Sequence, residues 1–88
     1  MAGYRLLIKR TAAKEIEALG AKADRQRIID SIQALAAQPR GKATEKLAGY
    51  ADRYRLRQGR YRVVYLIDDV RREVTVFKVA HRKEAYRP

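Results

Sequence analysis

The stretch from residue 53 to residue 65, which reads RYRLRQGRYRVVY, constrains the fold more than any other part of the chain. Apolar and arginine side chains alternate before Gly59, and a period of two is the period of a β-strand. A glycine between two such runs predicts a tight turn, and therefore a β-hairpin. Five of these thirteen residues are arginine. One face of the hairpin must therefore carry a high positive charge while the other is buried.

The sequence predicts further strands on both sides of this hairpin. Residues 4–9 (YRLLIK) form a short run with an apolar centre, which suits a first strand. Residues 61–67 are almost entirely apolar after Arg62, which is typical of a central strand. An acidic turn at residues 68–72 precedes a last strand at residues 74–80. The connections are only a few residues long, so these strands are expected to form an antiparallel meander.

Two helices are expected between the first strand and the hairpin. The first follows Thr11, a plausible N-cap, and stops at Gly20. The second runs from about residue 22 to residue 37, and residues 40–49 form a loop. Apolar residues recur at helical spacing in both segments, which indicates helix faces packed in a core. They are Ala13, Ile16 and Leu19 in the first helix and Ile28, Ile29, Ile32, Leu35 and Ala36 in the second.

The expected element order is therefore β-α-α-β-β-β. This order predicts an α+β fold in which the N-terminal strand and the helical hairpin pack on one face of a small antiparallel sheet. With 88 residues, the chain is expected to form a single domain over residues 1–88. The second sheet face would remain open, basic and hydrated.

Composition narrows the classes of function. The net charge of +11 favours nucleic acid as the partner, ahead of an acidic protein and an anionic membrane surface. The chain has no cysteine and one histidine, which excludes disulfides, thiolate catalysis and cysteine-based metal sites. No run approaches the ~18 apolar residues of a membrane span, and the N-terminus lacks a signal-peptide pattern. We expect a cytoplasmic protein that does not bind membranes and needs no cofactor or metal.

The residues with chemical potential are mostly cationic. Arg55 and Arg57 share a strand face, Arg62 lies across the hairpin, and three further groups follow the last strand. Those three are His81, Arg82 and Tyr86. We expect all six at one end of the open face, with the arginines exposed and directed at phosphate. Cleavage of RNA by its own 2′-hydroxyl requires a base, an acid and positive charge, and these residue types supply them.

Each of these residues also has a purely structural interpretation. Arg55 and Arg57 would then only solvate a face or protect a strand edge from pairing. The tyrosines of the hairpin would pack in the core rather than stack on bases. His81 would be an ordinary surface histidine, and Tyr86 would cap the core.

Residues 46–87, from KLAGY to HRKEAYR, resemble the C-terminal half of RelE-family toxins of the RelE/ParE superfamily. The matching features are a K-L-x-G loop, a Y-R-x-R strand, G-x-Y-R-V-x-Y, a short acidic turn and V-x-H-R-x-x-x-Y. The N-terminal helical hairpin that ends in a proline also matches. The resemblance implies a RelE-like fold and a type II toxin that is a metal-independent, ribosome-dependent mRNA endonuclease.

The resemblance also implies roles for individual residues. By position, the resemblance implies catalytic roles for Arg62, Arg82 and Tyr86. His81 lies beside these positions and is expected to belong to the same site. The residues expected to bind RNA are Arg53, Arg55, Arg57 and Arg60. Guanidinium groups do not deprotonate in proteins, so no arginine can be the base. Position favours Tyr86 as the base, whereas the general suitability of histidine for proton transfer near neutral pH favours His81.

The implied partners are a cognate acidic antitoxin, messenger RNA in the ribosomal A site and ribosomal RNA. Operator DNA would be bound only through the antitoxin complex. Two alternatives stay open. One is a ParE-like poison of DNA gyrase that cuts no nucleic acid, and the other is a degenerate member that only binds its antitoxin or operator DNA.

Overall fold

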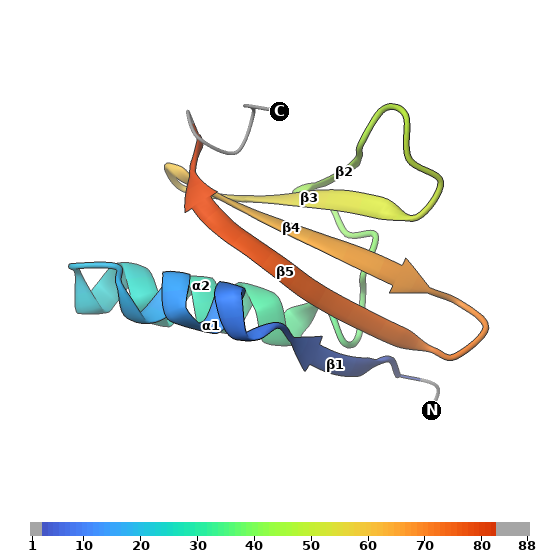
Figure 1. The fold of residues 1–88 in the computed structure, drawn as a ribbon, viewed down its shortest axis with the longest axis horizontal. Helices are drawn as coiled ribbons and strands as arrows, with labels where there is room; N and C mark the ends of the chain where they lie inside the picture. Colours follow the sequence, from blue (N-terminus) through green and yellow to red (C-terminus); the bar gives the residue numbers. More distant parts are fainter. Residues whose placement is uncertain (1–2, 83–88) are drawn as a thin grey trace.

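The computed structural model describes residues 3–82, which form two helices and a five-stranded sheet (Figure 1). The elements in chain order are β1 (Arg5–Ile8), α1 (Arg10–Glu17), α2 (Lys22–Ala34), β2 (Thr44–Lys46), β3 (Arg53–Gln58), β4 (Tyr61–Asp68) and β5 (Glu73–His81). The strand order across the sheet is β1-β5-β4-β3-β2. β1 runs parallel to β5, and the other neighbours are antiparallel. The predicted α+β arrangement is confirmed. The sheet is mixed rather than purely antiparallel, because β1 does not pack on a sheet face as expected but joins the edge of the sheet parallel to β5.

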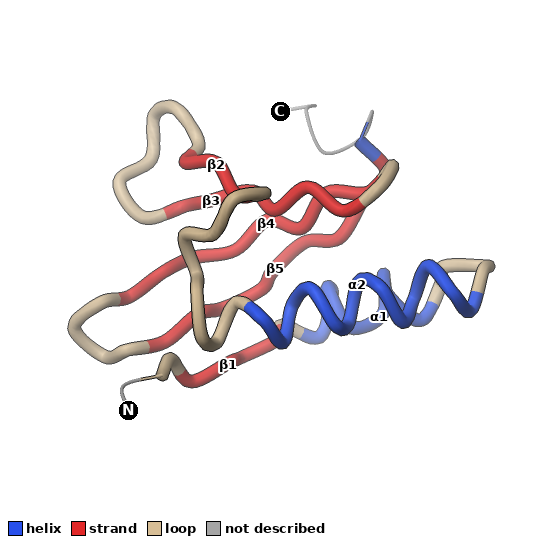
Figure 2. Tube along the Cα trace, turned by 180° about the vertical axis from the view of Figure 1, so that it is seen from behind, coloured by secondary structure: helices blue, strands red, loops and turns tan. Residues whose placement is uncertain are grey.

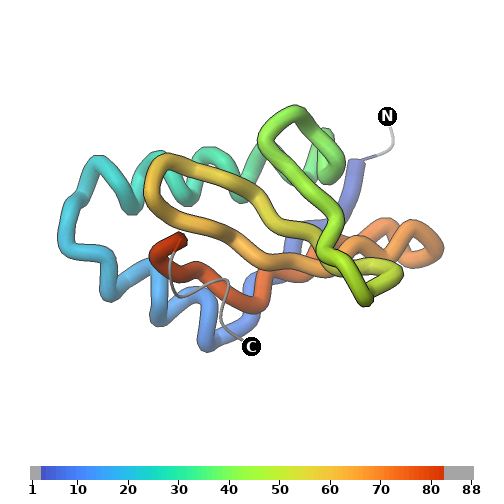
Figure 3. Tube along the Cα trace, turned by 90° about the horizontal axis from the view of Figure 1, so that it is seen from above, coloured from blue at the N-terminus to red at the C-terminus, as the bar shows by residue number. Residues whose placement is uncertain are grey.

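Both helices lie on the same side of the sheet (Figures 1 and 2). Figure 3 looks onto the opposite side of the sheet, and α1 and α2 lie behind the sheet on either side of the β3–β4 hairpin. The core lies between the two layers, and the phenol ring of Tyr65 on the central strand β4 is fully buried in it. The helices contribute Ala12, Ile16, Ile28 and Ile32 to this core, and Leu35, the C-cap residue of α2, adds to it. Within residues 3–82, no helix is long and apolar enough to cross a membrane.

The helix boundaries differ in detail from the sequence expectation. Helix α1 begins at Arg10, and its N-cap is Lys9 without a side-chain capping hydrogen bond. The hydroxyl of Thr11 instead donates to the carbonyl oxygen of Phe77 on β5 (3.4 Å), so Thr11 attaches the helix to the sheet. Helix α2 ends at Ala34, three residues earlier than expected. Ile29, which was expected in the apolar stripe, is 36% exposed.

The expected loop over residues 40–49 contains a strand that the sequence analysis missed. β2 comprises only Thr44, Glu45 and Lys46, and it pairs with β3 at the edge of the sheet (Figure 2). Its sequence has no apolar alternation, because an edge strand of three residues buries little surface. Thr44 closes the preceding turn by donating to the carbonyl oxygen of Gly41 (2.6 Å).

A β-bulge in the β4–β5 ladder changes which residues of β5 face the helices. Val64 pairs with Lys78, but the next residue, Tyr65, pairs with Val76, so Phe77 is an extra residue on β5. A bulge of this kind shifts the alternation of side chains along its strand. Consequently Val76 and Val79, three positions apart, are both buried in the core.

Candidate functional site

The sheet face that is turned away from the helices carries a row of arginines, which we call the arginine face. Arginine alternates with core-facing residues along β3, and Leu56 between two of them is buried on the helix side. Side chains two residues apart on a strand share a face. The arginine face consists of Arg53, Arg55 and Arg57 on β3 and Arg62 on β4.

Arg57 and Arg62 are direct register partners across the hairpin. Arg57 is exposed, whereas Arg62 is only 6% exposed. Arg62 Nη1 donates to the carbonyl oxygens of Gly59 (3.1 Å) and Tyr61 (2.8 Å). The expectation of an exposed Arg62 is therefore wrong, because the carbonyl groups of the β3–β4 turn hold its guanidinium. Its buried Nε has no acceptor among residues 3–82.

The other two members of the arginine face contact neighbouring side chains. Arg55 Nη2 donates to Glu45 Oε1 of β2 (2.8 Å), and the Arg55 side chain is 13% exposed. The guanidinium of Arg53 lies over the rings of Tyr50 (4.6 Å) and Phe77 (5.2 Å). These cation–π contacts and the ion pair fix the row in place.

Two further arginines lie at the hairpin end of this face. The backbone N–H of Arg82, directly after β5, donates to the carbonyl oxygen of Arg60 in the β3–β4 turn (2.8 Å). Both residues are exposed. The structure therefore brings Arg57, Arg60, Arg62 and Arg82 to one end of the sheet, as the sequence analysis expected for three of them.

His81 does not join the arginine face. It pairs with Tyr61, so it projects to the helix side, whereas Arg62 pairs with Ala80 on the other side. The His81 ring meets the Tyr61 ring edge-on, with centroids 6.1 Å apart. The expectation that His81 borders the open face is wrong. Tyr86 lies outside the described residues.

The hairpin tyrosines follow the structural interpretation. Tyr54 and Tyr65 stack on the helix side with centroids 5.9 Å apart. The Tyr65 hydroxyl donates to the carbonyl oxygen of Pro39, and burial raises the pKa of Tyr65 to about 12. Tyr61 packs against the same core, and its hydroxyl lies 3.4 Å from Asp24 Oδ2. These three tyrosines pack with the core rather than forming a base-stacking platform on the arginine face.

A cluster that the sequence analysis did not identify lies around Asp69, in the β4–β5 turn. Arg40 donates to both carboxylate oxygens of Asp69 (3.2 and 2.8 Å), and the Tyr4 hydroxyl donates to Oδ1 (2.6 Å). These hydrogen bonds hold the pKa of Asp69 below its ordinary value and raise the pKa of Arg40 above its own. The cluster joins segments 29 and 65 residues apart in the chain, and no local pattern signals such a contact.

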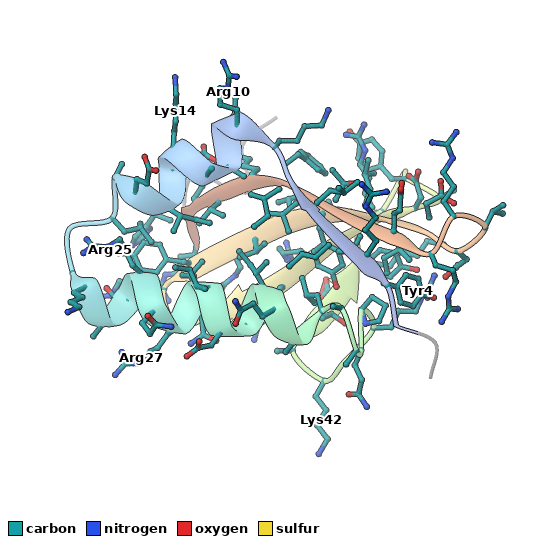
Figure 4. All side chains as sticks on the ribbon, turned by 90° about the horizontal axis from the view of Figure 1, so that it is seen from below. Tyr4, Arg10, Lys14, Arg25, Arg27 and Lys42 are labelled. Carbon is teal, nitrogen blue, oxygen red and sulfur yellow. The ribbon has the colours of Figure 1, made fainter. Side chains whose placement is uncertain are left out.

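Positive charge is not confined to the arginine face. On the helix side, the side chains of Arg10 and Lys14 on α1, Arg27 on α2 and Lys42 after α2 point outward (Figure 4). Two polar cavities adjoin the hairpin. The larger, about 270 Å³, is lined by Asp24, Arg27, Gln58, Gly59, Arg60 and Tyr61. The smaller, about 150 Å³, is lined by Lys42, Ala43, Thr44, Glu45, Arg55 and Arg57. Within residues 3–82, acidic and histidine side chains form no cluster of three that would hold a metal ion.

The chain as a whole is similar to known toxins over most of its length. Residues 6–86 match the family model described as the ParE toxin of the type II toxin–antitoxin system parDE. The RelE–RelB complex of Pyrococcus horikoshii OT3 is similar with a TM-score of 0.78 and 29% identity, over 93% of this chain and 97% of that chain. The isolated E. coli RelE toxin is similar with a TM-score of 0.75 and 30% identity, over 89% of this chain and 83% of that chain.

A third similar structure is the YoeB/ParE toxin of Agrobacterium tumefaciens, with a TM-score of 0.72 and 19% identity over 88% of this chain and 96% of that chain. At this identity the likeness concerns the fold alone. No curated protein matches the sequence significantly.

Proposed function

The chain belongs to the ParE toxin family of type II toxin–antitoxin systems, within the RelE/ParE superfamily, and from this premise we propose that it is a metal-independent endoribonuclease that cuts messenger RNA on the ribosome. The proposal covers the class of reaction and its dependence on the ribosome. It also gives the arginine face the role of the RNA-binding surface.

The observation that carries this proposal is the row of arginines on the sheet face that the helices leave uncovered. Guanidinium groups bind phosphate through paired, charge-assisted hydrogen bonds. Neighbouring residues of one face lie about 7 Å apart along a strand, so the row offers successive cationic positions to a phosphodiester backbone. Arg60 and Arg82 extend the row past the hairpin turn.

The proposed reaction is an attack by the 2′-oxygen of one nucleotide on the adjacent phosphorus. The bond from the 2′-oxygen to phosphorus forms, and the bond from phosphorus to the 5′-oxygen of the next nucleotide breaks. A base accepts the 2′-hydroxyl proton, and an acid donates a proton to the leaving 5′-oxygen. Negative charge grows on the phosphoryl oxygens in between, where fixed cationic donors are most effective.

The structure suggests different roles for the arginines. Arg57 and Arg82 are exposed and are proposed to contact the scissile phosphate. Carbonyl oxygens at the turn hold the guanidinium of Arg62. We therefore propose that Arg62 maintains the shape of the β3–β4 turn and adds positive charge behind Arg57. Tyr86 is the proposed base, because arginine cannot accept the proton and His81 projects to the other face.

The proposed partners are a cognate antitoxin, messenger RNA in the A site and ribosomal RNA, with the cytoplasm as the site of action. Similar structures include toxin–antitoxin complexes from Mycobacterium tuberculosis, E. coli and Methanococcus jannaschii. A net charge of +11 favours an acidic antitoxin segment and fast, salt-sensitive association. Operator DNA would then be bound through the antitoxin complex.

Cleavage of a defined message on programmed ribosomes tests the proposal. Wild-type protein should cut the message in the presence of ribosomes and not in their absence. Arg57→Gln should lower single-turnover cleavage by ~10²-fold, as expected when one transition-state donor is lost. Arg10→Gln is the matched control, since it removes the same charge from the helix side (Figure 4). Equal losses in both variants would contradict the proposed role of the arginine face.

Poisoning of DNA gyrase is the second candidate, because the family model that matches is that of ParE toxins. The same preparation separates the two candidates. A gyrase poison inhibits DNA supercoiling and leaves the message intact on the ribosome. A degenerate member has neither effect and binds only its antitoxin or operator DNA.

A further inference from the structure

An acidic residue lies within the basic row of the sheet. Glu45 is the middle residue of β2, and its register partner on β3 is Arg55. Residues paired in this way project to the same face, so Glu45 stands on the arginine face. Its carboxylate accepts a hydrogen bond of 2.8 Å from Arg55 Nη2.

The burial of this ion pair is unequal. The side chain of Arg55 is 13% exposed, and that of Glu45 is 63% exposed. Together with Lys42 and Arg57, the pair lines the cavity of about 150 Å³ beside β2. The carboxylate therefore lies on the solvent side of the guanidinium, where an arriving anion would bind.

A carboxylate and a phosphate compete for the same donors. The carboxylate is planar and the phosphate is tetrahedral, but both accept paired hydrogen bonds from one edge of a guanidinium group. A phosphate that is to bind Arg55 through Nη2 must first displace Glu45 Oε1. The exposed carboxylate can move away at little cost, because surface ion pairs contribute only ~0–1 kcal/mol.

We propose that Glu45 is an internal competitor that occupies Arg55 and so weakens the binding of RNA away from the ribosome. This inference rests on the proposed function, since it takes RNA as the ligand of the arginine face. Glu45 is a positioning and specificity-determining residue here, and it takes no part in proton transfer. On the ribosome, the additional contacts with ribosomal RNA supply the free energy that displaces it.

The consequence can be measured without any cleavage. Glu45→Gln removes the competing charge and keeps the size of the side chain. One additional phosphate contact makes the slope of log affinity against log salt steeper by ~0.7 for a single strand. We expect Glu45→Gln to bind RNA ~2–5-fold more tightly at low salt, with that steeper slope.

The experiment is equilibrium binding of the full chain to a single-stranded RNA whose 2′-hydroxyls are methylated, measured over a series of salt concentrations. Glu17→Gln is the matched control, because Glu17 is the exposed last residue of α1 and its substitution changes the net charge equally. Glu17→Gln should leave the slope unchanged. The double variant with Glu45→Gln and Arg55→Gln should not show the gain in affinity, since the effects of substituting two contacting residues are not additive.

The inference is overturned by any of three results. Equal gains for Glu45→Gln and Glu17→Gln would show an effect of net charge alone. Weaker binding by Glu45→Gln would show that the carboxylate holds Arg55 in a productive position. Absence of RNA binding in every variant would show that RNA is not the ligand. Failure of cleavage on ribosomes with the predicted binding changes intact would instead contradict the proposed function.

Discussion

Arg57 and Arg62 lie directly opposite each other across the β3–β4 hairpin, yet one is exposed and the other is buried with two of its hydrogen bonds made to the turn. Identical residues on one sheet face therefore have different environments. Arg57 is available to a ligand, whereas Arg62 shapes the turn beside it. Substitution of Arg62 should therefore lower the free energy of unfolding more than substitution of Arg57.

Arg62→Ala is expected to destabilise the protein as well as to lower its activity. The substitution removes two charge-assisted hydrogen bonds to the carbonyl oxygens of Gly59 and Tyr61 and the packing of the arginine stem. It also removes the buried Nε that lacks an acceptor among the described residues, which offsets part of the loss. We expect a net decrease of ~1–3 kcal/mol in the free energy of unfolding. Urea unfolding followed by circular dichroism measures it.

Arg57→Gln is the control for this measurement, because Arg57 is exposed on the same face. Its free energy of unfolding should change by less than ~0.5 kcal/mol. If Arg62→Ala unfolds at the same urea concentration as Arg57→Gln and wild type, the turn does not depend on Arg62.

Local patterns predicted the elements best where alternation or helical spacing was clear. β3 was predicted as the strand between residue 53 and Gly59, because arginine and apolar residues alternate there, and its observed bounds are Arg53–Gln58. β2 was missed, since its sequence TEK is polar and pairing with β3 alone makes it a strand. The parallel pairing of β1 with β5 joins the two ends of the chain, and no short window of sequence contains it.

Tyr65→Phe should weaken the core without changing its shape. The Tyr65 hydroxyl donates to the carbonyl oxygen of Pro39, and both residues are buried. Removal of the donor leaves that carbonyl without this hydrogen bond, so we expect the free energy of unfolding to fall by ~1–3 kcal/mol near neutral pH. Thermal unfolding of both proteins measures the difference, and Tyr54→Phe, at a partly exposed position, should cost less.

The same pair of proteins gives a pH test. The pKa of Tyr65 is raised to about 12 in the folded state, whereas a tyrosine in the unfolded chain ionises near ~10. The stabilisation is therefore fully present below ~10 and is lost as the pH rises toward 12. The advantage of wild type over Tyr65→Phe should shrink across this range. An advantage that stays constant would contradict the burial of the phenol.

Asp69 should make stability depend on acid pH. Its pKa lies below the ordinary value of 3.8, because Arg40 and then Tyr4 donate hydrogen bonds to the carboxylate. A depressed folded-state pKa gives stabilisation that is present above the unfolded-state pKa and is lost as the pH falls. Wild type should therefore exceed Asp69→Asn in thermal stability at neutral pH, and the two should converge below about pH 4.

Asp30→Asn is the control for this cluster, because Asp30 accepts a hydrogen bond from the neutral side chain of Gln26 instead of an arginine. Its difference from wild type should be smaller at neutral pH. A difference between wild type and Asp69→Asn that does not vary with pH would show that the Arg40 ion pair contributes nothing to stability.

Alternation predicted part of the candidate site, and the expected position of one further residue, His81, was wrong. It correctly put Arg55 and Arg57 on one face. A strict period of two from Val74 would also have sent His81 to that face. The extra residue Phe77 at the bulge reverses the alternation, so His81 projects to the helix side. The burial of Arg62 depends on carbonyl groups of a turn, which residue types alone do not reveal.

Tyr86 is expected to act as the base of the proposed reaction. The resemblance to RelE toxins implies Tyr86, and guanidinium groups around a phenol favour its ionised form. Histidine is the commoner base near neutral pH, but His81 lies on the helix side with its ring against Tyr61. Geometry therefore opposes His81, and Tyr86 remains the proposed base although it lies outside the described residues.

Single-turnover cleavage on programmed ribosomes over a range of pH separates the two residues. Tyr86→Phe should lose at least the ~10²-fold that removal of a general base typically costs. His81→Gln should keep the rate within a few-fold of wild type and the same pH profile, because His81 lies on the helix side of the sheet, where its ring contacts Tyr61. Thermal unfolding of both variants serves as the control for folding. The assignment fails if Tyr86→Phe cleaves nearly as fast as wild type while His81→Gln, still folded, loses both rate and pH dependence.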